Sequence, residues 1–364
     1  LKMINEKKFE NLFGLPTRNP NDEITQTHCN MALAIQKVTE DIIIKIAYEA
    51  KRLTKSENLC LAGGVALNCV ANGKIEEKEI FKNIYIQPAA GDAGGSLGAA
   101  LAVYHMYYNK SRTINEYYDK MHGAYLGPFF SEKEIMIMNK KFKANYSRYE
   151  SMSHLTEHTA KLIAEGNVVG WFQDKSEFGP RALGNRSILA DPRDEKMQKK
   201  LNLKIKYREG FRPFAPSVME EDYNKFFEGN SLNPYMLLVK NVKSEILEEV
   251  SKNYSKLFFL EKLYTKRSKL QSITHVDFSA RIQAVSKQTN GKFWMLLNEF
   301  KKLTGIGVLI NTSFNVRGEP IVNSPTDAFK CFMNTEMDYL VIENYLYSKK
   351  DQKIKFKKIE FEKD

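Results

Sequence analysis

Two pairs of adjacent glycines constrain the first third of this 364-residue chain. Gly63-Gly64 follow the short apolar run 59–62, and Gly94-Gly95 follow the strand-like run 83–87 after a loop of small residues. A helical pattern begins directly after each pair. A strand that turns through glycines into a helix brings backbone N–H groups close to a ligand. The arrangement predicts an α/β unit whose two glycine turns belong to a binding site.

Asp92 stands just before the second glycine pair, at the expected start of a helix. A carboxylate at this position can cap the helix by accepting backbone N–H hydrogen bonds. It can also hold a divalent metal beside the phosphates of a ligand. Both interpretations of Asp92 stay open on the sequence alone.

The apolar pattern divides the chain into two α/β parts. Helical periodicity predicts a long helix over 25–54 in the first part. Further on, the chain becomes rich in Tyr and Lys, and a Gly-Pro pair at 127–128 interrupts any regular element. We predict a first domain over 1–125, a linker over 126–150 and a second, mixed α/β domain over 151–364. In the second domain, strands are expected at 167–172, 214–219, 235–242, 282–285, 307–310 and 339–342, and helices at 153–165, 194–203, 293–303 and 326–333.

Five arginines occur between Phe178 and Val218, among glycines, prolines and apolar residues. Charges on a helix surface normally alternate with acids at a spacing of four residues, and this stretch lacks that pattern. The guanidinium group offers a rigid pair of donors that fits phosphate or carboxylate groups. The stretch is either a polyanion site, most simply for nucleotide phosphates, or a basic surface loop. The arginines are Arg181, Arg186, Arg193, Arg208 and Arg212.

Further segments carry polar groups that suit a nucleotide. Lys206 and Arg208 alternate along the chain, which in an extended segment places both cations on one face. Another predicted strand ends in small polar side chains that include Ser313 and Asn315. Such groups can hold a ribose, a carbonyl or phosphate oxygens, and they also form ordinary turns. The polar run 275–281 contains one more arginine.

Charge, cysteine content and hydropathy limit the classes of function. Lys and Arg outnumber Asp and Glu by 55 to 44, and part of the excess lies in the tail 349–363. A basic tail is a poor indication of nucleic-acid binding, so we expect none. Four cysteines without CxxC spacing indicate free thiols in a reducing compartment, and we expect a cytoplasmic location. No apolar run approaches the roughly 18 residues that a membrane span needs.

Six segments of the chain form a characteristic set: LCLAGGVALNCVANGKI (59–75), AAGDAGGSLGAAL (89–101), EFGPRALGNRSILADPR (177–193), IKYREGFRPFAPS (205–217), HVDFSARIQ (275–283) and INTSFNVRGEPIV (310–322). Together they resemble the O-carbamoyltransferases of the nodulation-factor and antibiotic type. They follow that family's order and extend over nearly the whole chain. The resemblance implies that a first domain, with a partial sugar-kinase or actin-like ATPase fold, transfers a carbamoyl group to a hydroxyl of a sugar-containing acceptor. It implies that a second, YrdC-like α/β domain forms carbamoyl-adenylate from carbamoyl phosphate and ATP.

The resemblance also implies roles for single residues in the second domain. Lys206, Arg208 and Arg212 would be the catalytic residues that contact the phosphates and the carbamoyl group. Five more would complete the pocket, two of them by binding the adenylate or its Mg2+. They are Arg181, Asn185, Arg186, Ser313 and Asn315.

In the first domain, the resemblance places Gly63-Gly64 and Asn68 at the adenosine end of the intermediate and Gly94-Gly95 at its phosphate. Asp92 would bind a divalent metal of the transferase site, with Fe2+ as a candidate. The family usually has a nucleotide-binding half and a His-x-x-x-His metal motif earlier in this domain, and neither precedes Thr25 here. The sequence therefore predicts the C-terminal portion of such an enzyme, active in adenylate formation only.

One departure and two alternatives remain. The family usually has Gly-Arg-Met before Glu177, where this chain has Asp174-Lys175-Ser176, and lysine lacks the bidentate fork of arginine. A tRNA threonylcarbamoylation factor would share both fold types, although its two domains usually lie on separate chains. A non-catalytic nucleotide-binding scaffold would fit the shortened first domain. The sequence is compatible with a homodimer.

Overall fold

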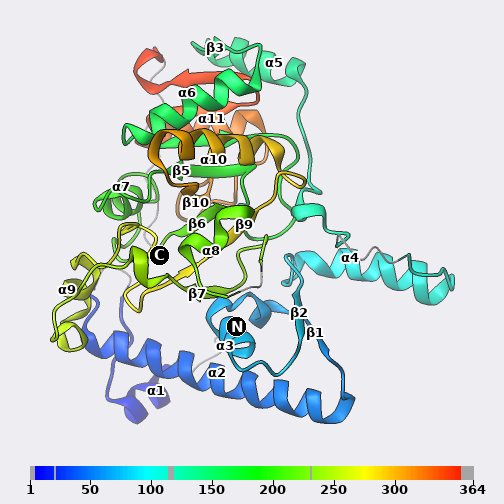
Figure 1. Ribbon diagram of the computed structural model, residues 1–364, viewed down its shortest axis with the longest axis vertical. Coiled ribbons are helices and arrows are strands. Elements are labelled where there is room, and N and C mark those ends of the chain that lie inside the picture. Colours follow the sequence, from blue (N-terminus) through cyan, green and yellow to red (C-terminus); the bar gives the residue numbers. More distant parts are fainter. Residues whose placement is uncertain (1–4, 20–21, 114–118, 230–231, 354–364) are drawn as a thin grey trace.

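The computed structural model describes residues 5–19, 22–113, 119–229 and 232–353 of the chain. The end of the basic tail, 354–363, lies outside this described part. Figure 1 shows a smaller N-terminal unit next to a larger unit that is built on an eight-stranded sheet. The architecture is mixed α/β, as the sequence predicts.

The smaller unit contains two parallel strands next to a long helix. The strands pair in register, with Leu59 opposite Ile84. The long helix packs through Ala47 with Ile75, while several of its other apolar side chains are exposed. The helix predicted over 25–54 and both predicted strands are confirmed. In chain order the elements are α1 (Glu6–Phe13), α2 (Gln26–Thr54), β1 (Asn58–Leu61), α3 (Cys69–Glu77), β2 (Asn83–Ile86) and α4 (Ala93–Ala102).

The sheet of the larger unit mixes parallel and antiparallel neighbours and is buried on both faces at its centre. Side chains of one central strand alternate between two cores. Val308 and Ile310 belong to one core and Leu309 to the other, as expected for a pleated strand. In spatial order the strands are β3 (Ser147–Arg148), β12 (Tyr345–Ser348), β11 (Tyr339–Ile342), β4 (Val169–Phe172), β5 (Arg186–Ala190), β10 (Val308–Ser313), β6 (Ala215–Met219) and β9 (Gln283–Val285).

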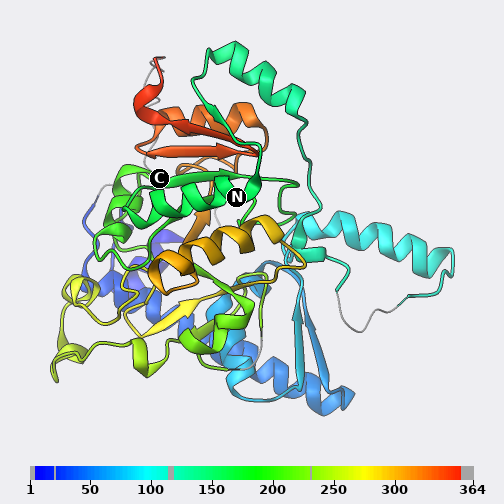
Figure 2. The same cartoon turned by 45° about the horizontal axis from the view of Figure 1, so that its top comes forward.

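Helices cover both faces of this sheet (Figure 2). A pair of helices covers one face and contributes Leu162 and Leu296 to its core. Three other helices cover the opposite face and contribute Met138, Leu201 and Phe329. The pair is α6 (Met152–Ala164) and α10 (Gly291–Thr304), and the other three are α5 (Glu132–Phe142), α7 (Met197–Lys204) and α11 (Pro325–Asn334).

A short antiparallel ribbon of the larger unit lies against the smaller unit. It consists of β7 (Val239–Asn241) and β8 (Ser279–Arg281). Its first strand packs on α3, where a Cβ on Gly73 would lie 2.7 Å from the Val239 carbonyl oxygen. A glycine permits this close approach of two backbones. Two short helices, α8 (Tyr223–Phe226) and α9 (Phe259–Tyr264), complete the larger unit.

The strand predictions are confirmed in part. The strand at 339–342 is confirmed. Of the strand predicted at 235–242, only the part that forms β7 is confirmed. The rest of that prediction is wrong, because Met236 has a left-handed backbone with φ of 59° that interrupts the extended chain. Strand β5 was not predicted from the sequence; it starts inside the arginine-rich stretch and forms by pairing with β4 and β10. Residues 132–148 of the predicted linker contain α5 and β3, which pack on the larger unit.

Candidate functional site

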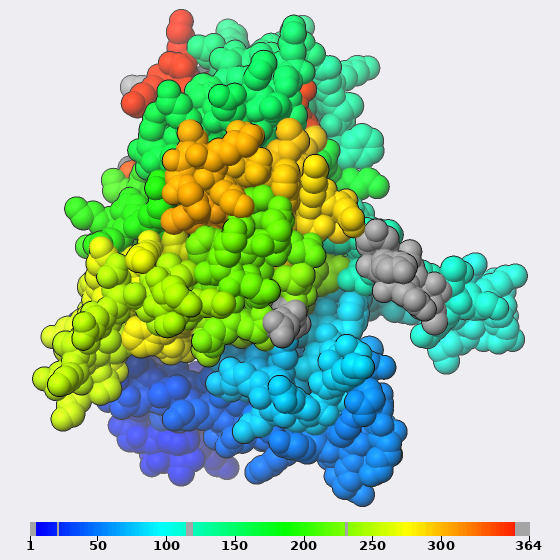
Figure 3. All heavy atoms as spheres, viewed as in Figure 1, coloured from blue at the N-terminus to red at the C-terminus, as the bar shows by residue number. Residues whose placement is uncertain are grey.

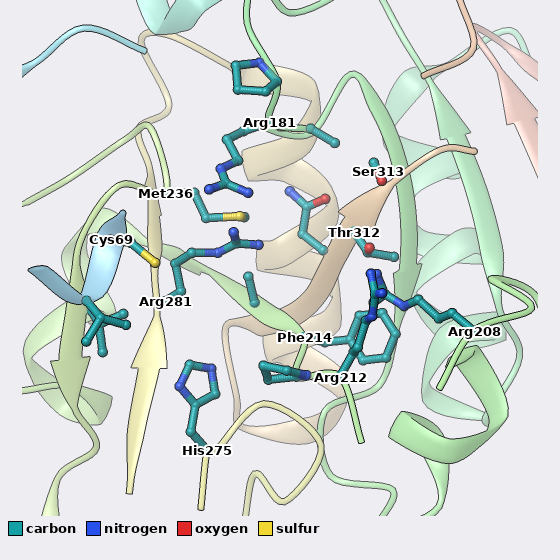
Figure 4. Close-up of a pocket in the computed structure, with 17 residues that line it drawn as sticks. Cys69, Arg181, Arg208, Arg212, Phe214, Met236, His275, Arg281, Thr312 and Ser313 are labelled. Atoms are coloured by element: carbon teal, nitrogen blue, oxygen red, sulfur yellow. The ribbon is translucent and has the colours of Figure 1, made fainter. Parts of the chain in front are cut away.

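A cavity of about 420 Å³ lies where α3 and the β7–β8 ribbon meet the end of β10. Figure 4 shows Arg181 and Arg281 on one side of the cavity and Arg208 and Arg212 on the opposite side. Four guanidinium groups from three parts of the chain therefore converge on one space, which we call the arginine cavity. All but Arg281 were predicted from the sequence as site residues. Ser313, another predicted site residue, also lines it.

Arg181 is held in a loop that glycine makes possible. Gly179 has φ of +137°, and its Cβ would lie 2.8 Å from the Pro88 carbonyl oxygen of the smaller unit. Arg181 donates one hydrogen bond to the Leu67 carbonyl oxygen at 3.2 Å. Its Nε is buried without a hydrogen-bond partner among the described residues, and burial lowers the pKa of the side chain. Such an unsatisfied buried donor suits an incoming anion.

Arg208 and Arg212 come from the turn that follows α7. Arg208 donates through Nε to Asn202 Oδ1 at 2.7 Å, and its guanidinium lies 5.1 Å from the ring centre of Phe214. Burial and the charge of Arg212 lower the pKa of Arg208 to about 10, although Glu209 opposes this. Arg212 pairs with Glu209 at 3.0 Å. Within the described ranges, Glu209 is the one carboxylate that forms an ion pair with any of the four cavity arginines, and its partner is Arg212.

Arg281 is the cavity arginine that the sequence analysis did not assign to the site. It ends β8, and burial together with the charge of Arg181 lowers its pKa. The sequence showed Arg281 as part of the polar run 275–281, but it did not show that this run lies against α3. Four guanidinium groups repel one another here, and among the described residues one of them alone is paired with a carboxylate, so together they create a site for a polyanion.

Pyrophosphate is expected to stabilise the folded chain by binding in the arginine cavity. At about 100 times its Kd, a ligand of the folded state adds about 2.7 kcal/mol to the free energy of unfolding. Arg281→Met should weaken the binding about tenfold or more, because a hydrogen bond to a charged group contributes about 1.5–3 kcal/mol. Denaturant titrations with and without pyrophosphate measure both effects.

Arg193→Met is the matched control for this titration. Arg193 pairs with Asp191 at 2.6 Å and does not line the cavity. Equal losses of pyrophosphate binding in the two variants would show that the effect is one of general surface charge.

Lys206 is buried beside the arginine cavity and does not line it. Its ammonium group donates to the carbonyl oxygen and Oγ of Ser313, and to the carbonyl oxygen and Oδ1 of Asn315. The expected extended geometry is wrong: Tyr207 has a left-handed backbone with φ of 49°, so Lys206 and Arg208 do not share a strand face. Burial and the charge of Arg208 lower the pKa of Lys206 to about 7. The structure thus brings three predicted site residues into direct contact.

Two predicted pocket residues, Asn185 and Arg186, lie outside the cavity wall. The buried Arg186 guanidinium stacks on Phe172 at 3.5 Å and donates to four backbone carbonyl oxygens. The Asn185 side chain donates to the Lys175 carbonyl and accepts from Asn290. Arg186 is the first residue of β5, and its side chain lies against the neighbouring β4. These contacts stabilise the loop before β5.

Glu177 organises the same loop, a role that the sequence analysis missed. Its Oε1 accepts hydrogen bonds from the backbone N–H groups of Leu183, Asn185 and Arg186 at 2.7, 2.9 and 3.2 Å. One carboxylate therefore fixes the backbone on the C-terminal side of Arg181. Lys175, which stands near the position of an arginine in the family pattern, is exposed and does not line the cavity.

The two glycine loops of the smaller unit lie next to each other. Gly63 donates its N–H to the Ala90 carbonyl oxygen at 2.7 Å. Asn68 caps α3 by accepting from the Ala71 N–H at 3.1 Å. Asp92 is exposed and makes no capping hydrogen bond, so the capping interpretation is wrong. The part of the chain that the structure describes contains no group of three His, Cys, Asp or Glu side chains suited to a metal. Asp92 and the described residues around it therefore do not form a metal site by themselves.

Gly94 and Gly95 are adjacent at the base of α4, which projects from the body of the molecule (Figure 3). A Cβ on Gly94 would lie 2.2 Å from the Ala89 carbonyl oxygen, whereas Cβ atoms on Gly63, Gly64 and Gly95 would meet nothing within 4 Å. Gly63, Gly64 and Gly95 therefore leave room for a ligand, whereas Gly94 is required by the close packing of the loop itself.

Gly94→Ala is expected to lower the free energy of unfolding by about 1–3 kcal/mol, because the added methyl group overlaps a backbone oxygen. Gly95→Ala should raise it by about 0.4–1 kcal/mol, since alanine restricts the unfolded chain and fits the helix. Chemical denaturation of the two variants measures the difference. Destabilisation of equal size at both positions would contradict these separate roles.

The two units correspond to two regions of known sequence families. Residues 2–101 match the carbamoyltransferase N-terminus, and residues 160–349 match the carbamoyltransferase C-terminus. None of the helices within the described ranges combines the length and apolar character that crossing a membrane requires.

Relatives extend the match to most of the chain. An uncharacterised protein from Synechocystis sp. is 52% identical over 97% of this chain and 57% of its own length. Nodulation protein NolNO from Sinorhizobium fredii is 38% identical over 93% of this chain and 47% of its own. A 3'-hydroxymethylcephem-O-carbamoyltransferase from Streptomyces clavuligerus is 29% identical over 90% of this chain and 55% of its own length. The chain thus spans about half the length of these relatives. The resemblance noted in the sequence is confirmed, and the chain belongs to the carbamoyltransferase family.

Proposed function

We propose that the larger unit has a YrdC-like fold and forms carbamoyl-adenylate from carbamoyl phosphate and ATP. The observation that carries this proposal is the convergence of four arginines on one cavity beside the buried Lys206. ATP and carbamoyl phosphate supply the negative charge that this arrangement lacks. The carbamoyl chemistry itself is proposed from relatives named as O-carbamoyltransferases.

The proposed reaction has two parts. Water cleaves carbamoyl phosphate into carbamate and inorganic phosphate. A carbamate oxygen then attacks the α-phosphorus of ATP, the bond to the oxygen bridging the β-phosphate breaks, and pyrophosphate leaves. The guanidinium groups would stabilise the charge on the phosphoryl oxygens during this transfer. Mg2+ is expected to enter with ATP and to neutralise part of the same charge.

We further propose that the smaller unit, with a partial actin-like fold, takes part in transferring the carbamoyl group to a hydroxyl of a sugar-containing acceptor. The close approach of Gly179 to Pro88 and the hydrogen bond from Arg181 to the Leu67 carbonyl support this, because they join the arginine cavity to the smaller unit. A short path suits an intermediate that water hydrolyses readily. No transfer step is assigned to Fe2+ at Asp92, since the described residues do not fit a metal.

Pyrophosphate release from ATP, measured with and without carbamoyl phosphate, tests the proposed function. We expect release only when carbamoyl phosphate is present. Release that requires threonine and bicarbonate would indicate a tRNA threonylcarbamoylation factor instead. ATP binding without any release would indicate a non-catalytic scaffold.

A further inference from the structure

His275 stands at the edge of the arginine cavity, close to Arg281 in Figure 4. Its backbone N–H donates to the Ser279 carbonyl oxygen at 2.8 Å, and its carbonyl oxygen accepts from the buried Arg267 at 2.9 Å. Arg267 also donates to the carbonyl oxygen of Thr274 in the same loop and to carbonyl oxygens at the end of α9 and just after it. The backbone that carries the imidazole is therefore fixed.

The partners of His275 determine which ring nitrogen carries the proton. Ser279 Oγ lies 2.6 Å from Asp277 Oδ1. A carboxylate only accepts, so the Ser279 hydroxyl donates its single hydrogen to Asp277. Ser279 Oγ lies 3.1 Å from Nδ1 of His275 and must accept a hydrogen bond from it. In the neutral ring, Nδ1 is therefore protonated and Nε2 has a free lone pair.

The surroundings of the ring favour its neutral form. Burial lowers the pKa of His275, and the charges of Arg281 and Arg267 act in the same direction, although Asp277 opposes them. Nε2 has no hydrogen-bond partner among the residues that the structure describes. It is a free acceptor at the cavity wall.

The rest of the cavity wall offers few acceptors of this kind. The four arginines can only donate. Asn311 Oδ1 is an acceptor without a described partner, but less than 1 Å² of it is accessible. The hydroxyl of Thr312 can either donate or accept, so it does not discriminate between ligand groups. Nε2 of His275 is thus a side-chain acceptor that cannot also donate, in a cavity whose charged side chains can only donate.

We propose that His275 selects the carbamoyl moiety by accepting a hydrogen bond from its amino group through Nε2. This inference rests on the proposed function, because it takes carbamoyl phosphate as the ligand. The phosphate oxygens of that ligand suit the arginines, and the amino group is its one neutral donor. Acetyl phosphate has nearly the same shape but carries a methyl group there, so it leaves Nε2 without a partner.

Calorimetric titration of the full chain with carbamoyl phosphate, acetyl phosphate and inorganic phosphate tests this selection. We expect carbamoyl phosphate to bind about 10- to 100-fold more tightly than acetyl phosphate. In His275→Phe this ratio should fall to about one, because the ring has no acceptor, while inorganic phosphate binds as before. Ser279→Ala retains the imidazole but removes the acceptor of Nδ1, so it should reduce the ratio by a smaller factor. Ser279→Ala also serves as the test if His275→Phe does not fold.

The outcomes separate the two proposals. If the unmodified chain does not bind carbamoyl phosphate, the proposed function is contradicted and this inference with it. If the chain binds carbamoyl phosphate but both variants keep the full ratio, only the role of His275 is wrong. If His275→Phe weakens ATP binding instead and leaves the ratio unchanged, Nε2 serves a ribose hydroxyl and the inference is overturned.

Discussion

Replacing Lys206 by methionine is expected to slow carbamoyl-phosphate-dependent pyrophosphate release by about 100- to 1,000-fold, the usual cost of losing one preorganised donor in an active site. The Lys206 ammonium group lies within hydrogen-bond distance of four oxygens of Ser313 and Asn315, and its three N–H groups can satisfy at most three of them at once, so methionine leaves these acceptors without a donor. Steady-state rates at saturating ATP measure the loss. Lys204→Met is the control. Lys204 is the last residue of α7, just before Lys206, and it forms an exposed ion pair with Glu336.

The pH dependence of Lys206 gives a second readout. Burial lowers its pKa from 10.5 to about 7, so the ligand-free amine loses its charge as pH rises through about 7. A bound anion favours the charged form, and pyrophosphate affinity should therefore fall as pH rises above 7. Because the unfolded state retains more protons between about pH 7 and 10.5, Lys206 makes stability rise with pH over that window. Lys206→Met should remove both dependences, and unchanged pH profiles would contradict the burial of a titrating amine.

Arg186→Met is expected to lower the free energy of unfolding by about 3–5 kcal/mol, because buried acceptors that lose their donor each cost about 1–3 kcal/mol. The guanidinium donates to the carbonyl oxygens of Gln173, Asn185, Pro128 and Asp174 at 2.6 to 3.3 Å. Methionine supplies none of these hydrogen bonds. Urea titration measures the effect.

This variant also separates two roles for Arg186. If Arg186 is structural, its substitution lowers the stability of the protein. If Arg186 binds phosphate, its substitution lowers the affinity for pyrophosphate and changes the stability little. Arg193→Met should cost about 1 kcal/mol or less, as a partly exposed ion pair does. A marginal stability change in Arg186→Met together with lost pyrophosphate binding would restore the role that the sequence implied.

The sequence predicted those helices and strands that a periodic or apolar pattern within the segment itself reveals. The strand 339–342 and the helix 25–54 are apolar runs with clear periodicity, and the structure has both. β5 was missed because its pairing with β10 joins segments more than 100 residues apart. The turn at Tyr207 was missed because nothing in the sequence requires a left-handed tyrosine there.

The candidate site was predictable to a similar degree. Residues with a motif of their own, such as Arg181 and Ser313, do lie together at the cavity. Arg186 was misplaced because the direction of its side chain depends on the register of β5. Arg281 and His275 were visible only as a polar run, since their place in the cavity depends on how the β7–β8 ribbon packs against the smaller unit.

Isolation of the intermediate tests the central claim most directly. The purified chain would be incubated with ATP and carbamoyl phosphate labelled at the carbamoyl carbon, and the nucleotide products separated at once. We expect the label in an adenylate that also contains AMP, in amounts matching the pyrophosphate released, and about 100- to 1,000-fold less of it in Lys206→Met over the same time. Pyrophosphate release without label in any nucleotide would contradict the formation of carbamoyl-adenylate in the arginine cavity.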